Sequence, residues 1–168
     1  MSESKQNKKI DKRAPVIVGV GDLVDRSKED GLNPQELLAK ACEHAIQDSG
    51  IKELNKHIDY VGVVRFTVDF LTATNQSNFQ YSNFPRTLAN KLNVSAKNEV
   101  YAPMGGNSPQ VLLEDALVKI STGETNCALL SGGEALQTMI AKLKAGMSLD
   151  WLDEPGGSPE MIGNNDIG

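Results

Sequence analysis

Short apolar runs alternate along the chain with longer segments whose apolar residues recur at a helical period. The runs predict four strands, over residues 14–22, 58–66, 98–103 and 126–133. Continuous apolar runs are typical of strands that are buried on both faces, as in parallel sheets. Strands that alternate with helices therefore predict an α/β fold, with right-handed crossovers and a mostly parallel sheet covered by helices.

The helical segments cover residues 33–50, 85–92, 108–122 and 134–146. The first of them carries clear start signals, because Asn33 can cap, Pro34 suits the first helical position and Glu36 completes a capping box. In the third, Ser108 and Pro109 are interpreted as a cap and a first helical residue. Its wide apolar stripe predicts a largely buried helix whose N-terminus points into the molecule.

Three segments lack such periodicity. Residues 1–13 are basic and predict a flexible tail, and residues 67–82 predict an extended loop. Residues 14–146 are expected to form one domain. The segment 147–168 is rich in Gly, Pro, Asp and Asn and contains Trp151, so we interpret it as the start of an insertion in an incomplete chain.

The charge and composition exclude several classes of function. The net charge is −5 and the sequence pI is about 5.1, which argues against a nucleic-acid partner. We expect no membrane span, because no apolar stretch reaches the roughly 18–20 residues that crossing a bilayer requires. We also expect a cytoplasmic location. Cys42 and Cys127 lie in apolar patterns without CxxC spacing, so we expect both to be buried, reduced thiols. We expect no metal site and no metal cofactor.

The first glycine-rich turn is GVGD, residues 19–22, directly after the first predicted strand. A dinucleotide fingerprint requires a third glycine where this chain has Val24, and a helix that begins there. We interpret the stretch as a tight backbone turn, and nucleotide binding is the weaker alternative.

The second turn is in YAPMGGNSPQVLL, residues 101–113, at the predicted start of the third helix. Helix N-termini present unpaired N–H groups and a partial positive charge, which favour anions. Gly105 and Gly106 allow close backbone approach, and Asn107 and Ser108 supply an amide and a hydroxyl. The two interpretations are a binding pocket for an acyl or phosphate group and a capped strand-to-helix turn.

The third turn is SGGE, residues 131–134, after the fourth predicted strand. Gly132 and Gly133 predict a tight structural bend, and Glu134 is expected in the first turn of the next helix, where the helix dipole favours it. His44 and His57 are interpreted as surface or half-buried residues and not as catalytic ones.

Together, three stretches resemble the N-terminal half of the thiolase superfamily. They are RAPVIVGVGD, HIDYVGVV and GGNSPQVLLEDALVKISTGETNCALLSGGEAL, and the resemblance covers about residues 14–145. In that family a strand leads to a buried helix of the form C-x-S-G-x-x-A, followed by I-x-x-G and a strand that ends G-G-x-E. Ile120 and Gly123 match the I-x-x-G, and Ser131, Gly132, Gly133 and Glu134 stand for the final turn.

The resemblance implies one βαβαβα half of a thiolase-like fold, truncated before its final strand. An ungapped count from Gly123 places the nucleophilic cysteine of the family at Gly106, so no catalytic residue is named. The pattern is similar to the divergent branch near the sterol-carrier-protein-type thiolases, whose members are often named acetyl-CoA acetyltransferases. That branch implies acyl transfer in lipid metabolism.

The expected ligand is acyl-CoA or coenzyme A, as substrate and not as cofactor, bound at Gly105, Gly106, Asn107 and Ser108. A homodimer is also implied, with the predicted strand 98–103 at the contact. The alternative is a non-catalytic acyl-CoA- or lipid-binding protein, or a scaffold subunit, on the same fold.

Overall fold

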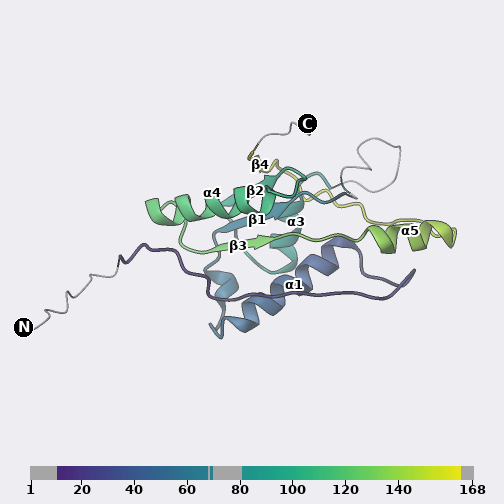
Figure 1. The fold of residues 1–168 in the computed structure, drawn as a ribbon, viewed down its shortest axis with the longest axis horizontal. Coiled ribbons are helices and arrows are strands. Elements are labelled where there is room, and N and C mark those ends of the chain that lie inside the picture. Colours follow the sequence, from purple (N-terminus) through teal and green to yellow (C-terminus); the bar gives the residue numbers. More distant parts are fainter. Residues whose placement is uncertain (1–10, 68, 70–80, 164–168) are drawn as a thin grey trace, which may run out of the picture.

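Four parallel strands form one sheet in the part of the chain that the computed structural model describes, residues 11–67, 69 and 81–163. The order of strands across this sheet is β3-β1-β2-β4 (Figure 1). The strands are β1 (Tyr60–Val64), β2 (Asn98–Ala102), β3 (Ala128–Ser131) and β4 (Glu160–Met161). The predicted parallel α/β class is confirmed, and three of the four predicted strands form.

The helices begin and end close to the residues that the sequence predicts. They are α1 (Pro34–Asp48), the short 3-10 helix η1 (Leu54–Lys56), α3 (Phe84–Lys91), α4 (Ser108–Thr122) and α5 (Leu136–Lys144). The capping box of α1 is present, with both the Asn33 and the Glu36 side chains engaged. The predicted cap of α4 is wrong, because Ser108 is already helical and Asn107 takes the cap position without a side-chain capping bond.

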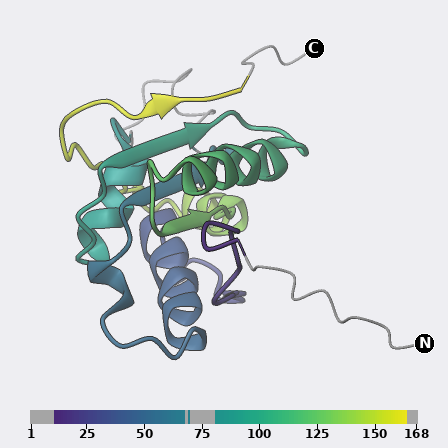
Figure 2. The same ribbon diagram turned by 90° about the vertical axis from the view of Figure 1, so that its left-hand side faces the viewer.

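Side chains of the central strands alternate between two apolar clusters, one on each face of the sheet. Val61 and Val63 of β1 pack into the larger cluster, which includes α1, α3 and α5, whereas Tyr60 packs into the smaller one beneath α4. Figure 2 shows the result as layers, with α4 lying along one side of the strands and α1 and α3 on the other. The period of two in a strand thus places helices on both faces.

Helix α4 lies close against β1 because Gly62 has no side chain. A Cβ at Gly62 would stand 2.7 Å from Cδ1 of Leu112 and 2.8 Å from Cε1 of Tyr60. The other side of α4 is open, since Leu117 is 38% exposed and Val118 60% exposed. The prediction of a largely buried helix is therefore wrong for the described residues, because the sheet covers only one side of α4.

The first predicted strand, residues 14–22, does not form. The segment is extended but pairs with no strand, and its apolar side chains are exposed, at 77% for both Val16 and Ile17. It runs beside α1 (Figure 1), where the N–H of Val20 donates to Oδ2 of Asp48 at 2.9 Å.

Glycines explain this packing of segment 14–22 on α1. A Cβ at Gly19 would collide with the carbonyl oxygen of Ala45, and one at Gly21 with that of Ala41. The two glycines of GVGD therefore allow two backbones to approach closely, which needs no bound nucleotide.

The segment 147–163 packs onto the domain, and its interpretation as the start of an insertion stays a prediction. Leu149 and Trp151 are buried in the larger cluster, and the backbone of Asp153 pairs with that of Tyr81 in an isolated parallel β-bridge. Further along, Nη1 of Arg86 donates to the carbonyl oxygen of Gly156 at 3.1 Å.

Strand β4 then covers the outer edge of β2. Val100 and Tyr101 pair with it, and Nζ of Lys119 on α4 donates to Glu160 at 2.8 Å. Strand β2, which we expected at a homodimer contact, is therefore flanked by β4 at Val100 and Tyr101 and is not an edge strand there. The homodimer stays a prediction.

The two other aperiodic segments lie largely outside the described residues: 1–10 of the predicted tail and most of the predicted loop 67–82. Where the tail is described, Nη1 of Arg13 donates to the carbonyl oxygen of Thr122 at 2.8 Å, at the end of α4. No helix in the described ranges is both long enough and apolar enough to cross a membrane.

Candidate functional site

An open cleft of about 670 Å³ lies where β1 and β3 end and α4 begins. Ligands commonly bind at this position in α/β proteins, outside the carboxyl ends of parallel strands. The residues that line the cleft are Val64, Arg65, Met104, Gly105, Gly106, Pro109, Leu112, Leu130, Ser131, Gly132, Gly133 and Glu134. Two of the three glycine-rich turns of the sequence therefore meet in one cavity, although they are far apart along the chain.

The turn before α4, of which Gly105 and Gly106 line the cleft, contains backbone N–H groups without a partner among the described residues. Gly105, Gly106 and Asn107 are exposed, and the N–H of Ser108 donates to the carbonyl oxygen of Gly105 at 3.1 Å. The N–H groups of Gly106 and Asn107 make no hydrogen bond to any described residue. They lie at the N-terminal end of α4, where the helix dipole adds partial positive charge. Within the described part of the chain, these two N–H groups are free to donate to a ligand, whereas that of Ser108 is already engaged.

Of the four predicted binding residues, Gly105 and Gly106 line the cleft, whereas Asn107 and Ser108 follow behind them in the turn. Ser108 is buried, at only 2% exposed, and no acid or base among the described residues hydrogen-bonds to its hydroxyl. A serine hydroxyl needs an adjacent base to become a nucleophile near neutral pH. The described residues therefore give Ser108 no support as a nucleophile, and its role in binding stays a prediction.

Gly106 differs from the other glycines of the cleft, because it has free space around it. A Cβ at Gly106 would have no heavy atom of the described residues within 4 Å. A Cβ at Gly132 would lie 3.3 Å from that of Val64, and one at Gly133 3.0 Å from Cδ1 of Leu38. Gly132 and Gly133 therefore serve the close packing of the chain as it leaves β3, whereas Gly106, which also lines the cleft, has room for a side chain.

Glu134 lies before α5 and not in its first turn, which corrects the sequence prediction, because Ala135 takes the cap position. Its Oε1 accepts a hydrogen bond from the N–H of Thr67 at 2.6 Å. The carboxylate therefore ties the chain after β3 to the chain after β1 across the cleft.

Arg65 is a residue of the site that the sequence interpretation missed. It follows β1, its N–H donates to the carbonyl oxygen of Ala102 at 3.0 Å, and its Nε donates to Oδ2 of Asp69 at 2.9 Å. The hydroxyl of Tyr101 donates to the same oxygen at 2.8 Å. The position of Arg65 in the sequence could have indicated its role. A charged residue directly after a buried strand lies at the edge of the sheet where parallel α/β proteins bind ligands.

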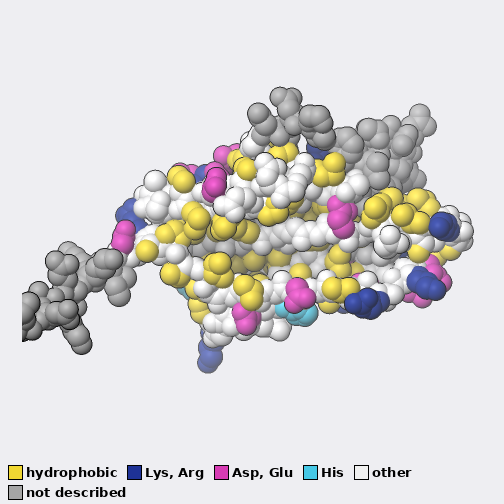
Figure 3. Space-filling model, viewed as in Figure 1, with side chains coloured by type: hydrophobic (Ala, Val, Ile, Leu, Met, Phe, Trp, Pro, Cys, Tyr) yellow, Lys and Arg dark blue, Asp and Glu magenta, His cyan; other side chains and the backbone are white. Residues whose placement is uncertain are grey.

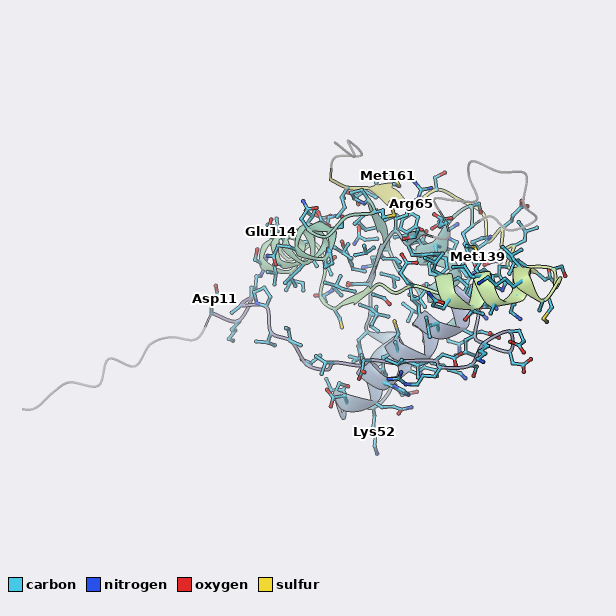
Figure 4. All side chains as sticks on the ribbon, turned by 45° about the vertical axis from the view of Figure 1, so that its right-hand side comes forward. Asp11, Lys52, Arg65, Glu114, Met139 and Met161 are labelled. Atoms are coloured by element: carbon cyan, nitrogen blue, oxygen red, sulfur yellow. The ribbon has the colours of Figure 1, made fainter. Side chains whose placement is uncertain are left out.

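Arg65 is the one cationic side chain among the described residues that line the cleft. The side chain is 31% exposed, whereas that of Asp69 is 4% exposed. In Figure 4, Arg65 lies toward the end of the molecule that carries Met161, opposite to Lys52, which follows α1. A buried carboxylate thus holds one edge of a guanidinium that stays accessible from the cleft.

Neither thiol of the chain lines the cleft. Burial raises the pKa of the Cys42 thiol to about 11, and burial together with the Asp59 carboxylate raises the pKa of Cys127. A thiol with a raised pKa carries little thiolate at neutral pH and is a poor nucleophile. His44 and His57 are both exposed and also lie outside the cleft. No group of three or more potential metal ligands gathers within the described ranges.

The remaining wall of the cleft is apolar, built from Val64, Leu112 and Leu130 beneath Met104 and Pro109. An apolar wall, two unpaired N–H groups, one guanidinium and one carboxylate suit a ligand with an aliphatic part and a polar carbonyl.

Comparison with solved structures finds a similar protein, a monomeric SCP2-thiolase like protein type 1 from Mycobacterium smegmatis. The TM-score is 0.56 and the sequence identity 29%, over 74% of this chain and 24% of that protein. No protein-family model matches the chain, and no curated protein matches its sequence.

The fold and the cleft define a parallel α/β protein with an open cleft at the carboxyl edge of the sheet. The solved structure makes the fold thiolase-like, as the resemblance of the sequence implied. The chain spans about a quarter of the length of that protein.

Proposed function

We propose that the cleft binds acyl-CoA thioesters and that the protein takes part in acyl transfer of the acetyl-CoA acetyltransferase type. The observation that carries the proposal is the meeting of the turn 105–108 and the turn 131–134 at the N-terminus of α4, with an apolar wall beside them. The thiolase-like fold supports this proposal. In the thiolase superfamily, which the sequence resembles, the nucleophile lies at the start of the corresponding helix.

Gly106 occupies the position of that nucleophile in the proposed function. The free space around Gly106 is what a removed side chain would leave. Without a thiol at this position no acyl-enzyme forms in the cleft, so transfer in two steps through a covalent intermediate is blocked. The N–H groups of Gly106 and Asn107 would polarise the thioester carbonyl, which leaves direct transfer between two bound molecules as the route.

A second candidate function is acyl-CoA binding without catalysis, as a binding protein or scaffold subunit. The observation in its favour is the composition of the cleft, whose described residues include no cysteine and no histidine. The thiols outside the cleft have raised pKa values and do not replace the missing one.

One experiment separates the two functions. The purified protein is mixed with acetyl-CoA and with longer acyl-CoAs, and both the thermal shift and the release of free CoA are measured. Stabilisation with CoA release supports acyl transfer, and stabilisation without release supports binding alone. The absence of any stabilisation would contradict the proposed ligand.

A further inference from the structure

The guanidinium of Arg65 is partly exposed, and one of its edges is not engaged by any residue that the structure describes. Its Nε is bound to Asp69, while Nη1 and Nη2 make no hydrogen bond to any described residue. The two outer nitrogens of an arginine match the two oxygens of a carboxylate in a planar, bidentate arrangement.

The guanidinium is also held in place, which a surface arginine is not. Asp69 is fixed in turn by the hydroxyl of Tyr101, and Cζ of Arg65 lies 5.8 Å from the centre of the Tyr101 ring. Burial, and the Asp69 carboxylate beside it, raise the pKa of Tyr101 well above its ordinary value, so its hydroxyl keeps its proton and donates. A pre-positioned side chain loses less conformational freedom when a ligand binds.

The other residues of the cleft indicate which anion fits. Arg65 follows Val64 directly, so the cation stands at the end of the apolar wall. Glu134, the carboxylate of the cleft, is engaged by the Thr67 N–H and forms no ion pair with Arg65. One cation, with one anion already present, balances a singly charged group better than a phosphate, whose charge is about −1.5 to −2 near neutral pH.

We propose that Arg65 selects acyl-CoA ligands whose acyl chain ends in a carboxylate, by a bidentate contact from Nη1 and Nη2. This inference rests on the proposed acyl-CoA function and adds the substrate class. The aliphatic part of the acyl chain lies along Val64, Leu112 and Leu130, and its terminal carboxylate meets Arg65.

The test compares thioether analogues of CoA that undergo no acyl transfer: S-alkyl-CoA and S-carboxyalkyl-CoA of matching chain length, over a short series of lengths. Both analogues carry the same CoA phosphates, so their affinity ratio isolates the terminal carboxylate. Calorimetry is expected to show the carboxylate analogue binding about tenfold more tightly or better at the best length, as a charge-assisted hydrogen bond supplies.

Two variants assign that ratio to Arg65. In Arg65→Gln the ratio falls close to one, and in Arg65→Lys it falls in part, because a lysine keeps a charge beside Asp69 but lacks the planar fork. Lys52→Gln removes the same charge from the exposed residue at the opposite end of the molecule and leaves the ratio as it is in the wild type.

Three results would overturn the inference. Equal affinities of the two analogues for the wild type would remove the carboxylate preference and leave the proposed function intact. If the affinity ratio of the two analogues persists in both Arg65 variants, the terminal carboxylate binds elsewhere, and any loss of affinity common to both analogues assigns Arg65 to the CoA moiety that they share. If no analogue binds the wild type at all, the proposed function fails together with this inference.

Discussion

At the scale of single residues, the site depends on what its glycines leave open. Gly132 and Gly133 are close to the side chains of Val64 and Leu38, so larger residues there would displace the packing. Gly106 has no such neighbour, although it lies in the same cleft. The position is therefore one where a side chain could be restored without disturbing the fold.

The first prediction concerns that restoration. In Gly106→Cys the new thiol lies at the N-terminal end of α4, where the helix dipole stabilises a thiolate, so its pKa falls below the usual value of about 8.5. The free energy of unfolding changes by no more than about 0.5 kcal/mol, as at a surface site. The rate of iodoacetamide alkylation as a function of pH gives the thiol pKa.

Ser121→Cys supplies the matched control for this measurement. Ser121 is exposed on the last turn of the same helix, where the dipole has the opposite sign and raises a thiol pKa. Equal pKa values in the two variants would contradict the account of the turn. Alkylation of the wild type corrects for Cys42 and Cys127.

At the scale of elements, the edge opposite the cleft is held by one buried carboxylate. Asp59 precedes β1, and its oxygens accept hydrogen bonds from the N–H of Asn126 at 3.0 Å, from the N–H of Cys127 at 3.1 Å and from Nδ2 of Asn126 at 2.9 Å. These contacts join the start of β1 to the residues that lead into β3. The alignment of the two strands at the cleft follows from this junction and from their ladder.

The second prediction is a pH dependence of stability that comes from Asp59. Burial acts to raise its pKa, but the hydrogen bonds from Cys127 and Asn126 outweigh burial and hold it below the ordinary value. A carboxyl whose pKa is lower in the folded state stabilises the protein above its unfolded pKa of about 3.9, and the contribution is lost as the pH falls through the folded value. Asp59→Asn therefore costs about 1–3 kcal/mol near neutral pH, and the difference from wild type shrinks in acid.

Denaturant unfolding of both proteins over a range of pH measures this difference. Asp30→Asn, at an exposed turn residue, is expected to match the wild type to within about 0.5 kcal/mol throughout. A cost for Asp59→Asn that stays constant as the pH falls would show that its charge does not hold the two strands.

Several elements were predictable because their signals are local. The capping box of α1 and the proline near the start of α4 mark helix starts, and the apolar runs of β1, β2 and β3 mark buried strands. The run at 14–22 was misleading, because its glycines pack on α1 and its valines stay exposed. Strand β4 gave no signal, since two residues carry no period and its pairing depends on contacts with β2 and Lys119.

The site was predictable in part for the same reason. The glycine-rich turns 105–108 and 131–134 were recognisable, and the parallel topology brings their ends to one cleft. Arg65 depends on Asp69 and Tyr101, whose approach is a property of the folded chain. No spacing rule along the sequence predicts that contact.

At the scale of the whole molecule, apolar side chains remain on the surface. Figure 3 shows them as a band over β3, between α4 and the extended segment 14–22. The exposed residues of these two elements include Val16, Ile17 and Val118. Contiguous exposed apolar surface commonly marks a protein–protein contact, and this band lies on the face where α4 has no cover.

The central claim is that acyl-CoA binds in the cleft in front of Gly106, and one measurement tests it most directly. The dissociation constant of acetyl-CoA is measured by calorimetry for the wild type, for Gly106→Trp and for Ser121→Trp. Gly106 lines the cleft and has open space for a Cβ. We therefore expect a tryptophan there to occupy part of the cleft, and we predict binding at least about tenfold weaker in that variant and unchanged binding in Ser121→Trp. Equal affinity in all three proteins would place the ligand outside the cleft and contradict the account.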